Sequence, residues 1–139
     1  MNTSRLLFIA DDDKDDIFIF RMALAQVDPS VKLVTAQDGI EAMKKLKHPQ
    51  AMVPDFIFLD LNMPKMSGKE CIEEIRKETR LQNIPIIIYS TSSSPDDRKE
   101  SLELGANYFI TKFYRLNDLC TTLKTLLKKE RKEISNNPA

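Results

Sequence analysis

Short apolar runs alternate with amphipathic helical patterns along nearly the whole chain of 139 residues. Several of the runs are apolar almost throughout, which is typical of strands that are buried on both faces. Five of them lie at residues 6–10, 31–36, 56–60, 86–90 and 107–111. Regular alternation of strand and helix favours a parallel sheet with right-handed connections and helices on both faces. We therefore expect a doubly wound α/β domain with a five-stranded parallel sheet and five helices.

The segments between the runs each carry one apolar helical face. Residues 16–27, 40–47 and 69–79 show this pattern, and Ile40, Met43 and Leu46 illustrate its spacing. Ser94 precedes a proline and two acids, as at a helix N-terminus, and Gly105 is placed to end that helix. A last helix carries a row of leucines, which is extended by a charged run over residues 128–132. We expect one domain over residues 1–132 and a flexible tail at residues 133–139.

The composition argues against several classes of partner. Twenty-one basic residues balance twenty-one acidic residues, so the net charge does not favour direct nucleic-acid binding. The apolar runs are far shorter than the ~20 residues that span a bilayer, and the N-terminus lacks the pattern of a signal peptide. We expect a cytoplasmic protein with no membrane partner. Cys71 and Cys120 are isolated, so we interpret both as buried free thiols, and His48 as a surface residue in a loop.

Carboxylates follow two of the predicted strands. Asp11, Asp12 and Asp13 come directly after the first run, and Asp60 ends the third. In doubly wound sheets, ligands bind outside the carboxyl ends of the strands, where the strand order reverses. The same rule brings Ser90 and Lys112, which end or follow the fourth and fifth runs, to this edge.

The charges in this crevice predict a cation site. Asp11, Asp12 and Asp60 against Lys112 leave a net charge of −2, which one Mg²⁺ ion would cancel. Mg²⁺ prefers oxygen ligands and keeps positions open for phosphate oxygens. An aspartate here can act as a nucleophile toward phosphorus, with Lys112 stabilising the transferring group and Ser90 offering a hydroxyl.

Four motifs make the chain similar to a known family. They are the run of acids after Ala10, the stretch from Leu59 to Gly68, the sequence Tyr89-Ser90-Thr91, and the stretch from Gly105 to Lys112. Together they resemble the receiver domain of two-component response regulators, over roughly residues 6–127. The resemblance implies the strand order 2-1-3-4-5 of the flavodoxin-like, CheY-like fold.

The resemblance also implies residue roles. Asp60 would be the phosphoacceptor, and Mg²⁺ would be bound by Asp12, Asp60 and the backbone carbonyl of Asn62, with Asp11 acting through water. Lys112 would contact the phosphoryl group. A switch would consist of Ser90 and Phe109.

Partners follow from the same resemblance. A sensor histidine kinase would donate the phosphoryl group, and an unidentified protein target would read the switch. The chain would act as a signalling phosphoacceptor that catalyses its own phosphotransfer and autodephosphorylation, and not as an enzyme on a separate substrate. Homodimerisation through the fourth helix, fifth strand and fifth helix is a further expectation. The loop from His48 to Pro54 resembles that of small stand-alone receivers, some of which partner bacterial phytochrome kinases.

One departure keeps an alternative open. The family usually has proline after the lysine, whereas Phe113 follows Lys112 here, so a cis or a trans peptide remains possible at this bond. The alternative is a phosphorylation-independent interaction module, or pseudo-receiver, on the same scaffold. Asp13, Asp15 and Asp16 are interpreted as residues that cap the first helix.

Overall fold

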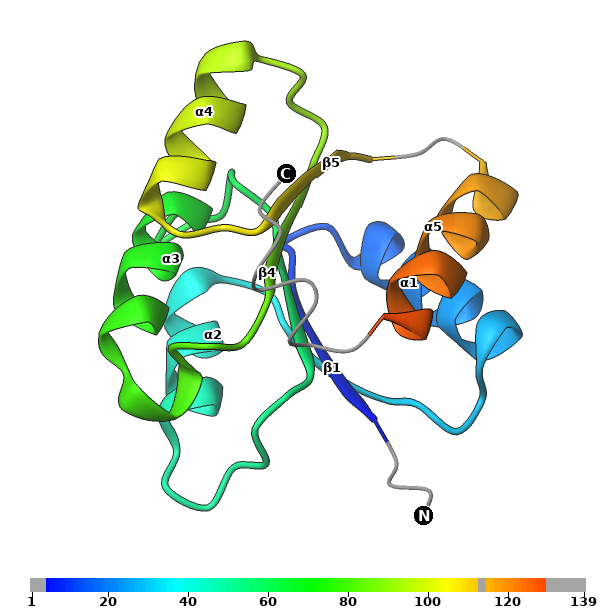
Figure 1. Ribbon diagram of the computed structural model, residues 1–139, viewed down its shortest axis with the longest axis horizontal. Coiled ribbons are helices and arrows are strands. Elements are labelled where there is room, and N and C mark those ends of the chain that lie inside the picture. The colour runs from blue at the N-terminus through cyan, green and yellow to red at the C-terminus, as the bar shows by residue number, and fades with distance from the viewer. Residues whose placement is uncertain (1–4, 113–114, 130–139) are drawn as a thin grey trace.

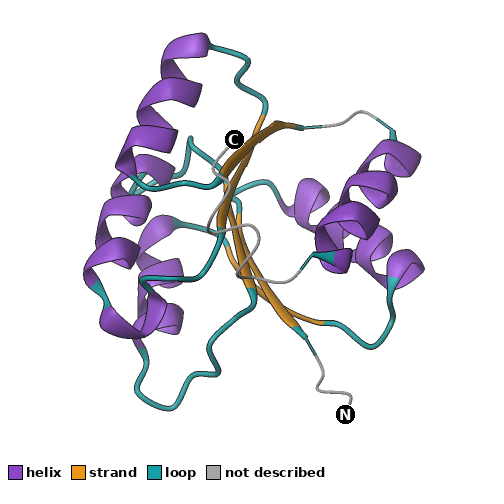
Figure 2. Cartoon of the chain, in the orientation of Figure 1, coloured by secondary structure: helices purple, strands orange, loops and turns teal. Residues whose placement is uncertain are grey.

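The computed structural model describes residues 5–112 and 115–129 and confirms the predicted doubly wound sheet (Figures 1 and 2). Its five strands are all parallel, in the order β2-β1-β3-β4-β5. The strands are β1 (Leu6–Ala10), β2 (Lys32–Ala36), β3 (Phe56–Leu59), β4 (Ile86–Ser90) and β5 (Tyr108–Thr111). The helices are α1 (Lys14–Val27), α2 (Gly39–Lys47), α3 (Gly68–Lys77), α4 (Pro95–Leu104) and α5 (Leu116–Lys128), with a short 3₁₀ helix η1 (Thr79–Leu81).

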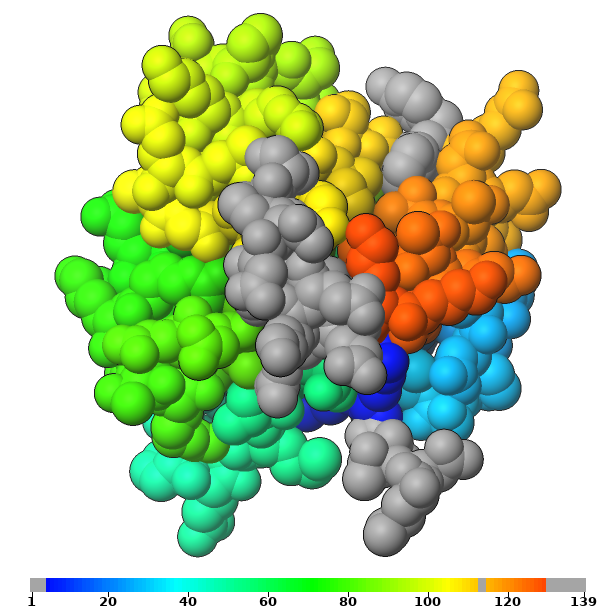
Figure 3. All heavy atoms as spheres, in the orientation of Figure 1, coloured from blue at the N-terminus to red at the C-terminus, as the bar shows by residue number. Residues whose placement is uncertain are grey.

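The helices cover both faces of the sheet. Figure 1 shows α2, α3 and α4 on one side, and α1 and α5 on the other. Alternate strand residues enter two separate cores: Phe8 and Ala10 of β1 pack with the first group of helices, while Leu7 and Ile9 pack with the second. The surface view shows α5 lying against the N-terminal third of the chain (Figure 3). Burial on both faces explains why the strand sequences are continuously apolar.

The helix boundaries are set by local hydrogen bonds. Helix α1 begins at Lys14 and not at residue 16, because the Asp13 carboxylate accepts hydrogen bonds from the amides of Asp15 and Asp16. Helix α3 has a capping box between Ser67 and Glu70. It ends at Lys77, two residues before the predicted end, and η1 follows.

Each outer strand of the sheet has one of its backbone carbonyls bound by a cation from a helix. Lys45 of α2 donates to the carbonyl of Thr35 in β2 at 2.6 Å. Arg98 of α4 donates to the carbonyl of Phe109 in β5 at 3.2 Å. The two contacts occupy carbonyls at opposite edges of the sheet.

Arg76 joins several segments at the amino ends of β4 and β5. Its guanidinium donates to the backbone carbonyls of Leu81, Gln82, Ile84 and Gly105, and to the side chain of Asn107. The Asn107 side chain in turn accepts from the amide of Ile86 at 2.9 Å. This network links α3, η1 and the α4–β5 connection far from the carboxyl ends of the strands.

Other predictions have mixed outcomes. Both cysteines are free; Cys71 is buried as expected, but Cys120 is only half-buried. His48 is exposed and follows α2. The Lys112–Phe113 peptide bond and the predicted tail at residues 133–139 fall outside the described residues. Within residues 5–112 and 115–129, no helix is long and apolar enough to cross a membrane.

Candidate functional site

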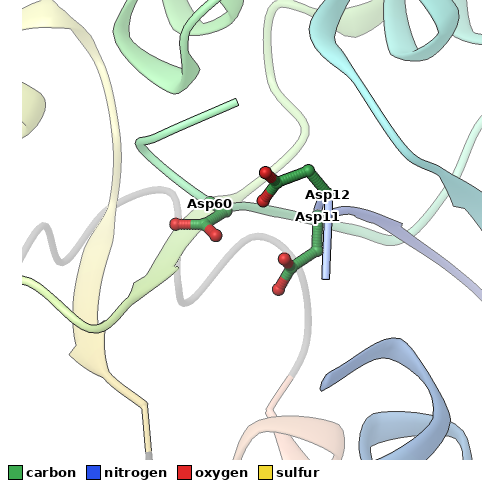
Figure 4. A group of neighbouring side chains, drawn as sticks. All are labelled: Asp11, Asp12 and Asp60. Atoms are coloured by element: carbon green, nitrogen blue, oxygen red, sulfur yellow. The ribbon is translucent and has the colours of Figure 1, made fainter. Parts of the chain in front are cut away.

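Three carboxylates converge beyond the carboxyl ends of β1 and β3. Asp11, Asp12 and Asp60 each offer an oxygen that lies within 4.8 Å of those of the other two. Figure 4 shows the three side chains close together, with those of Asp11 and Asp12 extending toward the side on which Asp60 lies. Asp11 and Asp60 are buried, whereas Asp12 is exposed. The predicted acidic crevice is therefore present, with one side open to solvent.

The sheet itself brings these acids together. The Asp11 amide donates to the carbonyl of Ala36 in β2, and the Asp60 amide donates to the carbonyl of Ala10 in β1, both at 3.0 Å. These bonds continue the parallel ladders one residue beyond each strand. Asp11 and Asp60 are thus held by the same backbone pairing that specifies the strand order.

The connection from β3 to α3 packs tightly beneath the site. The Gly68 amide donates to the carbonyl of Leu61 at 2.9 Å. A Cβ atom at residue 68 would lie 2.3 Å from the carbonyl oxygen of Asp60, which no side chain tolerates. Glycine is therefore required here by close backbone approach, and the start of α3 fixes the backbone of Asp60.

Lys112 lies against the carboxylates from the end of β5. Its Nζ atom is 2.7 Å from Oδ2 of Asp11 and 3.1 Å from Oδ2 of Asp60. The Lys112 amide donates to the carbonyl of Ser90 at 2.7 Å, which holds its backbone beside β4. The lysine thus reaches the site as predicted.

Burial and neighbouring charges have opposite effects on the pKa values of Asp11 and Lys112. Burial raises the pKa of Asp11 to about 6, although Lys112 and a hydrogen bond from the Asp13 amide act to lower it. Burial would lower the pKa of Lys112, but the neighbouring carboxylates of Asp11, Asp16 and Asp60 raise it above its usual value. Lys112 is therefore a permanent cation at the site.

A third acid, Asp16, contacts Lys112, and the sequence did not predict this contact. Asp16 of α1 places its Oδ2 atom 2.7 Å from Nζ of Lys112. Of the acids interpreted as caps, Asp13 alone accepts the capping hydrogen bonds, so this interpretation was wrong for the carboxylates of Asp15 and Asp16, which lie in the first turn. The contact joins residues 96 positions apart. Spacing alone could not reveal it, because Asp16 also suits the first turn of a helix.

The remaining predicted residues surround the carboxylates less directly. Ser90 is buried at the end of β4, and its hydroxyl accepts a hydrogen bond from the Ser92 amide at 3.3 Å. Asn62 is exposed in the connection that follows β3. Phe109 is a buried residue of β5 and packs in the core beneath α3 and α4.

The donor set fits a divalent cation. Metal–oxygen distances of about 2.0–2.6 Å place ligand oxygens at most roughly 4–5 Å apart, which the three carboxylates approach without rearrangement of the strands. Among the described residues, Oδ2 of Asp11 is buried and has no hydrogen-bond partner in suitable geometry, even though Lys112 is near. A buried carboxylate oxygen that accepts no hydrogen bond and lies beside two further acids is a suitable ligand for a hard cation.

A cavity of about 960 Å³ lies elsewhere, at the amino ends of β1 and β2. Its apolar lining includes Leu6, Phe8, Val34, Leu46, Met52 and Pro54. None of the three carboxylates, nor Ser90 or Lys112, borders it. The candidate site is therefore the acidic crevice and not this cavity.

Comparisons with known proteins agree with this geometry. Residues 7–124 match the family model of the response regulator receiver domain. The response regulator Rcp1 of Synechocystis sp. is 32% identical over 122 residues, which cover 85% of this chain and 83% of Rcp1. The sensor histidine kinase CheAY of Helicobacter pylori is 32% identical over 90% of this chain, which spans only 15% of that longer protein.

Solved structures give the same result. The phosphorylated cyanobacterial phytochrome response regulator RcpA superposes with a TM-score of 0.82 at 36% identity, covering 91% of this chain and 93% of RcpA. The Mn²⁺-bound form of Rcp1 superposes with a TM-score of 0.77 at 30% identity, covering 88% of this chain and 91% of that one. By its sequence, its strand order and its acidic crevice, the chain belongs to the response regulator receiver family of two-component signalling.

Proposed function

We propose that Asp60 accepts a phosphoryl group from the phosphohistidine of a sensor histidine kinase, in a reaction that requires Mg²⁺. The observation that carries this proposal is the convergence of Asp11, Asp12 and Asp60 at the carboxyl edge of the sheet, with Lys112 paired to Asp11 and Asp60. A relative solved with Mn²⁺ bound and a relative solved in its phosphorylated form support the same chemistry here.

In this reaction an oxygen of Asp60 attacks phosphorus, and the bond from phosphorus to the histidine nitrogen breaks. The nitrogen leaves with the electron pair and takes up a proton, while Asp60 becomes an acyl phosphate. Lys112 stabilises the negative charge on the transferring oxygens. Asp12, Asp60 and the carbonyl of Asn62 would hold Mg²⁺, with Asp11 acting through water, and the ion supplies further charge neutralisation. Attack of water on the acyl phosphate would later restore Asp60.

The signal would leave the site through Ser90 and Phe109. Phosphorylation changes the charge at Asp60 from −1 to about −2. The Ser90 hydroxyl accepts a hydrogen bond from the Ser92 amide at 3.3 Å in this structure, and its own proton would be donated to a phosphoryl oxygen. The shift of this loop would make room for Phe109 to move and change the α4–β5–α5 surface. This surface would bind the downstream protein or a second copy of the chain, in the cytoplasm.

Phosphorylation by a small donor tests the proposal. Incubation with acetyl phosphate and Mg²⁺ should add one phosphoryl group per chain, measured by intact-protein mass spectrometry. Asp60→Asn should abolish the addition, whereas Asp13→Asn should not, because asparagine also caps helices well. An unmodified wild-type protein would favour the pseudo-receiver, and an unchanged extent in Asp60→Asn would place the acceptor elsewhere.

A further inference from the structure

We propose that Asp16, in the first turn of α1, is a positioning residue that holds the ammonium group of Lys112 toward Asp60 during phosphorylation. The inference rests on the proposed function, and it assigns a role to an acid that lies outside the carboxylate cluster.

Three acids share the Lys112 ammonium group. Asp11 and Asp16 each place an oxygen 2.7 Å from Nζ, and Asp60 places one at 3.1 Å. The lysine side chain is only 9% exposed. The contacts with Asp16 and Asp60 have hydrogen-bond geometry, and the contact with Asp11 is an ion pair.

Two of these acids have other roles once a metal ion and a phosphoryl group are bound. Asp11 and Asp60 belong to the group of carboxylates that could hold a metal ion, and Asp60 is the proposed phosphoacceptor. Asp16 is not a member of that group within the described part of the chain. Asp16 is therefore the one acid of the three that stays available to Lys112 when a cation and a phosphoryl group engage the others.

Lys112 needs such an anchor because its backbone contact does not fix its charged end. The Lys112 amide is held by the carbonyl of Ser90, but four rotatable carbons separate the backbone from Nζ. A charge-assisted hydrogen bond from helix α1 restricts the ammonium group directly.

The anchor is itself held in place. The amide of Asp16 donates to Oδ1 of the capping residue Asp13 at 3.3 Å, and the side chain of Asp16 is 30% exposed. The Asp16 carboxylate thus projects from an ordered helix start to the rim of the site. Its position lets it bind Lys112 without contacting phosphorus.

The test compares Asp16→Asn with Asp15→Asn. Both variants remove one negative charge from the same helical turn, but among the described residues Lys112 forms ion pairs with Asp11, Asp16 and Asp60 and not with Asp15. At saturating acetyl phosphate and Mg²⁺, Asp16→Asn should lower the maximal phosphorylation rate about tenfold, as expected for the loss of one charge-assisted hydrogen bond. The half-saturating Mg²⁺ concentration should stay within about twofold, since Asp16 is not a metal ligand. Asp15→Asn should match the wild type in maximal rate.

A second measurement is independent of phosphorylation. The ¹⁵N-detected ammonium signal of Lys112 should be visible in the wild type and in Asp15→Asn, and it should broaden in Asp16→Asn through faster proton exchange. Asp16→Glu should restore part of the maximal rate, because it restores the charge with a longer side chain.

Several outcomes would overturn the positioning role. Equal maximal rates in Asp16→Asn and Asp15→Asn would do so, and a faster Asp16→Asn would show that Asp16 competes for Lys112 instead. If the wild type takes up no phosphoryl group, the proposed function is wrong, whatever the role of Asp16. An unchanged ammonium signal in Asp16→Asn would show that Asp16 does not hold the ammonium group of Lys112.

Discussion

At the scale of single residues, Asp11 is the most strongly perturbed acid of the site. Its side chain is fully buried, and burial raises its pKa to about 6 from an ordinary value of 3.8. A folded-state pKa above the unfolded value favours folding at low pH. The stabilising contribution is complete below about pH 4 and is lost as pH rises through about 6.

We therefore expect the metal-free protein to lose stability between pH 4 and pH 6. The rise in the pKa of Asp11 from 3.8 to about 6 corresponds to roughly 3 kcal/mol of stability. Asp11→Asn should remove this loss, since asparagine can still accept the hydrogen bond from the Asp13 amide through its side-chain oxygen. Urea unfolding at several pH values without divalent ions measures the effect. Parallel pH profiles of the wild type and Asp11→Asn would contradict it.

At the scale of elements, the connection between β3 and α3 governs the position of Asp60. Two glycines contact this connection so closely that neither position has room for a Cβ atom. A Cβ at Gly39 would lie 2.2 Å from the carbonyl oxygen of Met66, and a Cβ at Gly68 would lie 2.3 Å from the carbonyl oxygen of Asp60. Within the connection, Lys65 has a left-handed backbone with φ of 70°. The starts of α2 and α3 therefore clamp this loop between them.

Gly68→Ala should displace the loop and weaken the site. Overpacking of this kind typically costs about 1–3 kcal/mol, and the backbone contact leaves Asp60 as one of the groups that must move. We expect lower stability in urea and weaker Mg²⁺ binding by titration. Ser67→Ala is the matched control, because losing the cap costs about 1 kcal/mol without crowding Asp60. Equal Mg²⁺ affinities in both variants would show that the loop tolerates the methyl group.

At the scale of the whole molecule, one end of the sheet carries the candidate site and the other carries a structural hydrogen-bond network. The carboxyl ends of the strands carry the acids and Lys112, while the amino ends of β4 and β5 are joined by Arg76. Burial lowers the pKa of the Arg76 guanidinium, and five acceptor groups compensate for its loss of water. The structural network and the proposed chemistry are thus spatially separate.

Arg76→Met should destabilise the protein without altering the chemistry. Removing the guanidinium leaves several partly buried carbonyls without a donor, for which we expect a loss of about 3 kcal/mol in urea unfolding. Phosphorylation of Asp60 per folded molecule should stay unchanged. Lys77→Met is the control, because its ion pair with Glu74 is exposed and contributes less than about 1 kcal/mol. A small effect of Arg76→Met, equal to that of Lys77→Met, would argue against the network.

The sequence predicted features that follow from periodicity and strand order. Continuous apolar runs identify the strands, and the edge at which Asp11 and Asp60 meet follows from parallel pairing. Two contacts could not be predicted. In the sequence, Arg76 has the pattern of an ordinary charged residue of an amphipathic helix. Its hydrogen bonds become evident only when the surrounding segments are placed in three dimensions. The contact of Asp16 with Lys112 depends on the path of two side chains that lie 96 positions apart in the sequence.

The cations on the outer strands have a consequence for the protein in concentrated solution. The exposed edge of a sheet can recruit a strand from another molecule, and this is a common start of aggregation. Lys45 and Arg98 each occupy a carbonyl that an incoming strand would need. A neighbouring chain would have to displace a charged donor at either edge before it could extend the sheet. We therefore expect these two side chains to help keep the folded protein from polymerising through its strands.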